Sequence, residues 1–264
     1  MYNKIPIIIS LFIFFSPFAS AQVETSVVVP NSLTDTEGPD QLGFPINCNP
    51  GALPDGIRYQ QVYLNSQISQ NGGVVEIVGI NFRSAEEEPE NPPVIIPQFQ
   101  IDMSITQAEP DNLSLTFANN LGLIVTTVYS GPLTVSTPQC GAGPCPFSLR
   151  IPLQTPFMYD SSEGNLIIDV KRPICGLTSI TLDASQASED LDNTSNAFTS
   201  NGGSVNDPDA FLANNSGLVT EFDIILPPPV VTPIPTLSEW SLIVMAGILG
   251  IIGYMVIRRR KAAA

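Results

Sequence analysis

The sequence contains no histidine in its 264 residues. This absence excludes the Ser-His-Asp and Cys-His catalytic arrangements, and it also excludes metal sites that use imidazole ligands. The sequence also lacks a glycine-rich phosphate-binding loop between a strand and a helix, so nothing in it supports nucleotide chemistry. Paired carboxylates are plentiful, and a glycosidase needs only two of them at the right separation.

Basic residues are also scarce, with 10 Lys and Arg against 25 Asp and Glu. The segment 22–226 holds five basic and 24 acidic residues, a formal charge of −19. Its basic residues are Arg58, Arg83, Arg150, Lys171 and Arg172. A field of this sign repels the phosphates of nucleic acids and the headgroups of anionic lipids. We therefore expect no nucleic-acid partner.

The first 21 residues have the pattern of a secretory signal peptide. An apolar run over 5–15 is followed by the small residues Ala19-Ser20-Ala21. Signal peptidase recognises such a small-x-small triplet, so we expect export by the Sec machinery and cleavage between Ala21 and Gln22. The alternative, a retained N-terminal anchor, is disfavoured because the apolar run is short and is broken by Pro6.

The four cysteines are Cys48, Cys140, Cys145 and Cys175. An even number of cysteines in an exported chain indicates disulfides, and three connectivities are open. The spacing of Cys140 and Cys145 suits a local loop, which would leave Cys48 to pair with Cys175. A metal site is the rival interpretation, but the chain offers no histidine ligand and the spacing is not that of a zinc site.

The middle of the chain has strand periodicity. An extended lead-in, 22–45, is punctuated by prolines and carries one candidate edge strand at Val27-Val28-Val29. Short β-prone runs separated by Gly, Pro, Asn and Asp follow over 46–226. Phe99–Thr106 alternates strictly between apolar and polar residues, as a strand with one wet face does. The pattern predicts an all-β ectodomain, a single β-sandwich of jelly-roll or Ig-like type. We expect 185–209, rich in Ser, Asn and Asp, to form a surface excursion.

The C-terminal region has three parts. A proline-rich spacer, 227–233, precedes a short motif at 234–240 and an uncharged segment at 241–257. At ~1.5 Å per residue this segment reaches about 26 Å as a helix, enough to cross a thin bilayer. The basic end, 258–264, predicts a cytoplasmic C-terminus and an inner-membrane helix. The expected stop-transfer residues are Arg258, Arg259, Arg260 and Lys261.

The motif is carried by Ile234, Pro235, Thr236, Leu237 and Trp240. Together with the helix and the basic block it resembles the IPTL-CTERM sorting signals, relatives of the PEP-CTERM tails of Gram-negative bacteria. One departure is Ser241, where the family usually has glycine. The resemblance implies that a membrane-embedded exosortase recognises the motif, cuts nearby, and releases the ectodomain to the cell surface or the extracellular matrix.

Two acidic segments are candidates for a calcium site. Asp190 and Asp192 alternate in one segment, and Asp207 and Asp209 alternate in another. Such spacing suits hard-cation loops, but neither segment continues as an EF-hand. Because Asp is also an ordinary turn residue, solvated loops are the favoured interpretation. We expect no cofactor, with Ca²⁺ as the alternative.

Function is harder to predict for the ectodomain than for the tail. Asp160 and Asp169 flank the best-patterned strand, but most surface carboxylates only face solvent. The aromatic residues Tyr59, Tyr63, Phe157 and Tyr159 suit sugar stacking, yet such residues are more often half-buried in strands. We expect a non-catalytic surface or matrix protein. The alternatives are a carbohydrate-binding or adhesive module, with extracellular polysaccharide as its partner, and a polysaccharide-active enzyme.

Overall fold

The computed structural model describes residues 22–69, 73–176, 178–186, 193–199, 202–227 and 237–262. The chain divides after Pro227 into two compact units, and each is described by itself. The predicted signal peptide 1–21 lies outside the described residues, as do Ile234, Pro235 and Thr236 of the motif.

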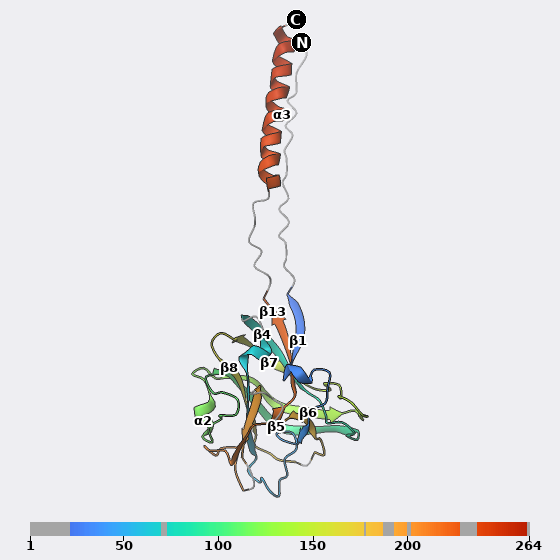
Figure 1. Ribbon diagram of the computed structural model, residues 1–264, viewed down its shortest axis with the longest axis vertical. Coiled ribbons are helices and arrows are strands. Elements are labelled where there is room, and N and C mark those ends of the chain that lie inside the picture. The colour runs from blue at the N-terminus through green and yellow to red at the C-terminus, as the bar shows by residue number, and fades with distance from the viewer. Residues whose placement is uncertain are drawn as a thin grey trace, which may run out of the picture. The chain divides into compact units, whose positions relative to one another are not determined.

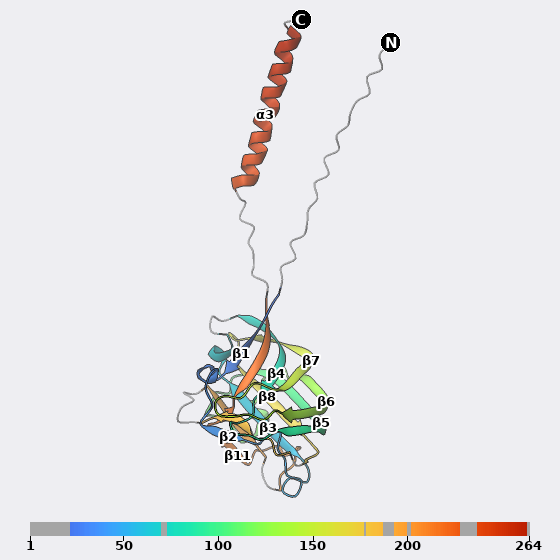
Figure 2. The same ribbon diagram turned by 90° about the vertical axis from the view of Figure 1, so that its right-hand side faces the viewer.

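The first unit contains a four-stranded antiparallel sheet in the order β1-β13-β4-β7. Both views place β1 alongside β13 (Figures 1 and 2), and the register pairs Val23 with Leu226 and Val29 with Thr220. The strands are β1 (Val23–Val29), β13 (Thr220–Leu226), β4 (Val74–Phe82) and β7 (Leu149–Asp160).

A second sheet has six strands in the order β11-β10-β3-β8-β5-β6, and a small third sheet has the order β12-β9-β2. The bounds of the larger sheet are β11 (Leu212–Asn214), β10 (Thr194–Phe198), β3 (Ile57–Tyr63), β8 (Asn165–Arg172), β5 (Asn91–Thr106) and β6 (Thr126–Thr137). The remaining elements of this unit are β12 (Gly217–Leu218), β9 (Leu182–Ser185), β2 (Asp40–Leu42), η1 (Asn31–Leu33), α1 (Asn65–Ile68) and α2 (Phe117–Asn120).

One hydrophobic core joins the two large sheets. Alternate residues of their strands, such as Ile80 and Phe82 on β4 and Ile101 and Met103 on β5, belong to a single buried cluster. This alternation is what a pleated strand with one covered face requires. The prediction of an all-β fold is confirmed. Among the described residues, every buried side chain lies between positions 28 and 224, so this unit has its own core.

The extended lead-in expected at 22–45 is instead part of the sandwich. Its first strand, β1, pairs with β13 over seven residues, and Val28 and Val29 are buried. The segment also supplies β2. The edge strand expected at Val27-Val28-Val29 is present, and it is longer than its valines indicated because the exposed residues 23–26 also pair with β13. The sandwich therefore begins at Val23 and not at Ile46.

The surface excursion expected at 185–209 contains a fully buried strand, β10. Two of its polar side chains donate to carbonyl groups: the Thr194 hydroxyl to Val62 at 2.7 Å, and the Asn196 amide to Ser216 at 2.6 Å. The side-chain oxygen of Asn196 is buried and has no hydrogen-bond partner among the described residues. Hydrogen bonding makes a polar strand stable inside a sheet, and composition alone does not reveal it.

Two disulfides join Cys48 to Cys175 and Cys140 to Cys145, the pairing preferred from the sequence. The Cα atoms are 5.0 Å apart in the first pair and 5.8 Å apart in the second. The short one closes a loop of the chain just before β7. The long one ties the segment before β3 to the segment after β8, and Cys48 is fully buried.

The second unit is one helix, α3 (Leu237–Ala262), with Arg259, Arg260 and Lys261 in its last turn. Its described side chains, from Ser241 to Lys261, are all exposed. A helix that is apolar on every side, as this one is from Leu242 to Ile257, is suited to a lipid environment.

Candidate functional site

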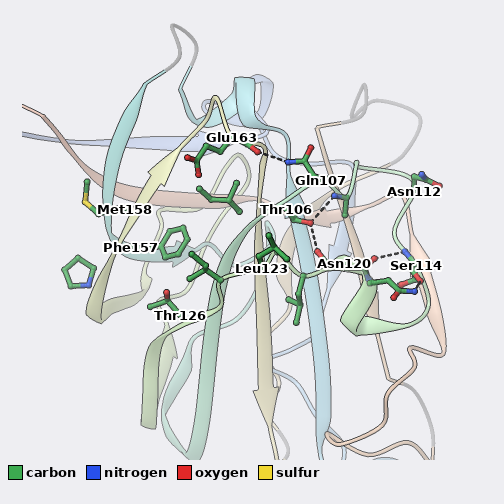
Figure 3. Close-up of a pocket in the computed structure, with 17 residues that line it drawn as sticks. Thr106, Gln107, Asn112, Ser114, Asn120, Leu123, Thr126, Phe157, Met158 and Glu163 are labelled. Carbon is green, nitrogen blue, oxygen red and sulfur yellow. Dashed lines mark hydrogen bonds between the residues drawn. The ribbon is translucent and has the colours of Figure 1, made fainter.

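A groove in the sandwich lies between the β5–β6 connection and the end of β7, and its volume is about 930 Å³. Apolar side chains lie at its centre and amide and carboxylate groups lie around it (Figure 3). Those used below are Gln107, Asn112, Asn119, Leu123, Ile124, Thr126, Phe157, Met158 and Glu163.

The β5–β6 connection, 107–125, is held against the end of β5. The Thr106 hydroxyl donates to the carbonyl of Asn120 at 2.6 Å, and the Gly122 amide donates to the hydroxyl of Ser104 at 3.1 Å. A Cβ atom on Gly122 would lie 1.7 Å from the carbonyl oxygen of Ile105. Only glycine allows this close approach, and it fixes one wall of the groove.

Helix α2, within the same connection, is fixed to the six-stranded sheet by buried contacts. Gln60 donates to the carbonyl of Phe117 at 3.2 Å and accepts from the Asn120 amide at 3.0 Å. The guanidinium of Arg58 lies 4.5 Å from the centre of the Phe117 ring, a cation–π contact. This wall of the groove is therefore built on rigid elements.

The groove presents uncovered apolar side chains. Leu123 is fully exposed, and Ile124 and Met158 are 79% and 59% exposed, whereas Phe157 is buried and belongs to the hydrophobic core. Phe157 and Leu123 lie near each other in Figure 3, with Met158 on one side. A patch of exposed apolar side chains beside polar groups is typical of a ligand or partner site.

One end of the groove is polar. The Gln107 amide donates to the carbonyl of Glu163 at 2.7 Å, which leaves the Glu163 carboxylate exposed. A smaller cavity of about 240 Å³ shares Gln107 and Glu163 and adds Glu109. Glu109 accepts from the Asn165 amide at 3.1 Å. None of the residues lining either cavity is basic.

Three of the five ectodomain cations form ion pairs with buried carboxylates. Arg58 lies 2.6 Å from Asp169, Arg83 lies 2.6 Å from Asp183, and Lys171 lies 2.7 Å from Asp102. Arg172 is buried and donates to backbone carbonyls, including that of Gly176 at 2.9 Å. Burial lowers the pKa of Arg172 to about 10. Of these five cations only Arg150 is classed as exposed, so the accessible surface of the ectodomain is strongly acidic.

The two carboxylates singled out from the sequence serve separate local roles. Asp160 accepts hydrogen bonds from the hydroxyl of Ser162 at 2.6 Å and from its amide at 2.9 Å, and these bonds lower the pKa of Asp160. Asp169 is bound by Arg58 through two nitrogens, at 2.9 and 2.6 Å. Neither residue lines the groove.

The calcium candidates are engaged in loop hydrogen bonds where the structure describes them. Asp207 accepts from the Ser204 amide at 2.7 Å, and Asp209 accepts from the Thr116 hydroxyl at 2.7 Å. Asp190 and Asp192 lie outside the described residues. Within the described part of the chain, no group of three or more Cys, Asp or Glu residues is arranged to hold a metal ion.

Most of the aromatic residues considered for sugar stacking belong to the core. Tyr59, Tyr63 and Tyr159 are fully buried, and burial raises the pKa of each hydroxyl. The Tyr63 hydroxyl is 3.0 Å from that of Thr220. Phe157 alone among the aromatic candidates lines the groove.

Glu37 gives a stability prediction. Burial and the nearby Asp183 raise the pKa of its carboxyl, and one of its oxygens has no hydrogen-bond partner. A carboxyl with a raised pKa stabilises the fold at pH values below its ordinary pKa of 4.5. This contribution is lost as the pH rises through the pKa of the folded state. We therefore expect Glu37→Gln to raise the melting temperature at neutral pH and to have less effect near pH 4, measured by circular dichroism. An equal shift at both pH values would contradict this account.

The C-terminal helix is long and apolar enough to cross a membrane. Ser241–Lys261 spans 21 residues with a mean hydropathy of 2.0, and it is the one such helix among the described residues. At ~1.5 Å per residue it is about 32 Å long, which matches the hydrocarbon core of a bilayer.

The residues around this helix carry a known sorting motif. Residues 232–261 match the IPTL-CTERM motif. The resemblance seen in the sequence is confirmed. The IPTL-CTERM match indicates a C-terminal sorting signal, and with the apolar helix it indicates an exported, membrane-associated protein. Comparisons with curated proteins and with solved structures found no match for the chain.

The IPTL-CTERM tail was predictable from the sequence, but the groove was not. Its lining comes from segments far apart in the chain, 105–126 and 156–163. The one local signal is the exposed apolar run Leu123-Ile124-Val125, which directly follows a glycine and looks like the start of a strand. The structure shows that β6 begins only at Thr126.

Proposed function

We propose that this chain is a non-catalytic protein of the cell surface or extracellular matrix. Its IPTL-CTERM tail holds it in the inner membrane until an exosortase cuts the tail. The observation that carries the proposal is the coincidence of motif, apolar helix and terminal basic residues within 232–261. Basic residues stay on the cytoplasmic side of a membrane, so the ectodomain would lie outside, where its disulfides are stable.

Support for a non-catalytic role comes from the buried carboxylates, each of which has a cationic partner. A general acid needs a raised pKa and access to substrate. Burial acts to raise the pKa of Asp102, but hydrogen bonds from Lys171, Thr127 and Gln100 hold it below its ordinary value. Burial does raise the pKa of Asp183, yet its side chain is fully enclosed with Arg83.

Truncation after Pro227 tests the role of the tail. We expect the full chain to sediment with the inner membrane and the truncated chain to be soluble outside the cytoplasm, with both disulfides formed in each. The reason is that the removed segment contains the one described helix able to span a bilayer. Fractionation with an ectodomain antibody and intact mass would measure this. A full chain that is soluble in the cytosol, reduced and intact at both ends would exclude the proposal.

Processing is tested by comparing hosts with and without an exosortase. A product that has lost the tail should appear only when the enzyme is present, and Pro235→Ala with Trp240→Ala should abolish it. The matched control is Pro152→Ala with Phe211→Ala, exposed positions of the ectodomain outside the motif. Loss of the tail in both hosts, or in the motif variant, would contradict cleavage by an exosortase.

A further inference from the structure

The groove beside β7 combines three kinds of surface in one place: apolar, amide and hydroxyl, and acidic. We propose that it binds a polysaccharide whose sugars carry free amino groups. This inference goes beyond sorting by the tail and does not depend on it, because the groove lies entirely within the ectodomain.

The apolar part matches the C–H face of a sugar ring. Leu123, Ile124 and Met158 are exposed and line the groove, so a sugar ring lying against them would cover aliphatic surface that water now contacts. Gln107, Asn112 and Asn119 stand around the groove with exposed side chains. A planar amide can donate to one sugar hydroxyl and accept from the next. A purely apolar partner would make no use of these polar groups.

Charge selects among polysaccharides. The groove and its polar end carry the carboxylates of Glu163 and Glu109 and no basic residue. The surrounding ectodomain has a formal charge of −19, and the described ion pairs occupy three of its five cations. Such a field draws in cations and repels uronic acids and sulfates. A protonated amine on the sugar can pair with Glu163, and an acidic polysaccharide cannot.

The binding test uses the oxidised ectodomain, 22–227, which holds both disulfides and its own core. Titration calorimetry is run with an oligomer of β-1,4-linked glucosamine at about pH 6, where an amine is protonated. We expect saturable binding that weakens about tenfold when the amines are acetylated, because the charged hydrogen bond is lost. Alginate, which is anionic, should not bind. Equal binding of alginate, or no binding of the glucosamine oligomer, would overturn the proposal.

Matched variants locate the site. Glu163→Gln should weaken binding about tenfold, whereas Glu90→Gln removes the same charge from an exposed loop elsewhere and should leave binding unchanged. Met158→Ser should also weaken binding, and Ile95→Ser, at a strand position of similar exposure (65% against 59%), should not. All four positions lie outside the core, so the variants should fold. Parallel losses in the groove and control variants would show attraction by net charge alone and would overturn the assignment.

Hydrogen exchange gives a measurement without substitution. Adding the glucosamine oligomer should slow exchange in 119–126 and 156–163, and leave β1 and β13 unchanged. Protection elsewhere would contradict the site.

A basic peptide of alternating Lys and Leu serves as the competing partner class. If it binds the groove more tightly than the oligomer, the partner is a protein and the polysaccharide proposal is wrong. The truncation experiment on the tail is unaffected by either result.

Discussion

Replacing Arg83 by methionine should lower the free energy of unfolding by about 3–5 kcal/mol, because it leaves a buried carboxylate without its partner. Arg83 and Asp183 are 1% and 0% exposed, and their charged groups are 2.6 Å apart. The guanidinium also donates to the carbonyls of Leu33 at 2.9 Å and Thr36 at 2.5 Å. One side chain therefore fixes both Asp183 and the segment between β1 and β2. Urea unfolding of the oxidised ectodomain would measure the loss.

The loss should depend on pH. In the wild-type protein burial already raises the pKa of Asp183, and Arg83 counteracts that rise. Without Arg83 the folded-state pKa rises further above the unfolded value of about 3.9. A raised carboxyl pKa gives stability that is present below the unfolded pKa and is lost as the pH rises through the folded one. The deficit of Arg83→Met should therefore be largest at neutral pH and should narrow toward pH 4.

Two controls separate the buried pair from charge in general. Arg150→Met removes an exposed cation that has no ion pair among the described residues, and its effect should stay within about 0.5 kcal/mol. The double variant Arg83→Met/Asp183→Leu should be more stable than Arg83→Met alone, since no buried charge is left unpaired. A loss under about 1 kcal/mol for Arg83→Met would mean that water reaches Asp183 in the folded protein.

Much of the sandwich was predictable because strands with one covered face alternate. Phe99–Thr106 lies in β5, with Phe99, Ile101 and Met103 in the hydrophobic core. The opposite face was expected to be wet, but it is covered, since Asp102, Ser104 and Thr106 are buried as well. The tail was predictable for a different reason. Its features follow one another along the chain, so motif, helix and basic block are all visible in a single stretch of sequence.

Features that depend on long-range contacts were not predictable. Thr194–Phe198 is as polar as a loop, and it is a strand because its backbone pairs with β3 and β11, while Val62 and Ser216 accept hydrogen bonds from its side chains. The groove needs the β5–β6 connection to fold back onto β5 and meet β7. The pairing of Arg83 with Asp183 spans 100 residues, and nothing in the sequence near either one indicates it.

Removing the long disulfide should have the second large effect. Cys48 and Cys175 are 127 residues apart, and a cross-link over that length restricts the unfolded chain by about 5 kcal/mol in the loop-entropy description. Cys48→Ala/Cys175→Ala also removes sulfur from a small buried cluster with Leu53 and Ile57. Urea unfolding should show a loss approaching that size, with a larger m-value because the unfolded chain becomes more expanded.

The short disulfide is the natural comparison. Cys140 and Cys145 are five residues apart, and the same description gives about 2 kcal/mol for Cys140→Ala/Cys145→Ala. Native contacts support both ends of the long disulfide, since Arg172 donates to Gly176 at 2.9 Å and Thr178 donates to Ile46 at 2.9 Å. Those contacts keep the folded state intact when the sulfurs are removed, so the difference between the two variants reflects the unfolded chain. If the short-loop variant proves as destabilised as the long-loop one, chain entropy does not govern the contribution of either disulfide.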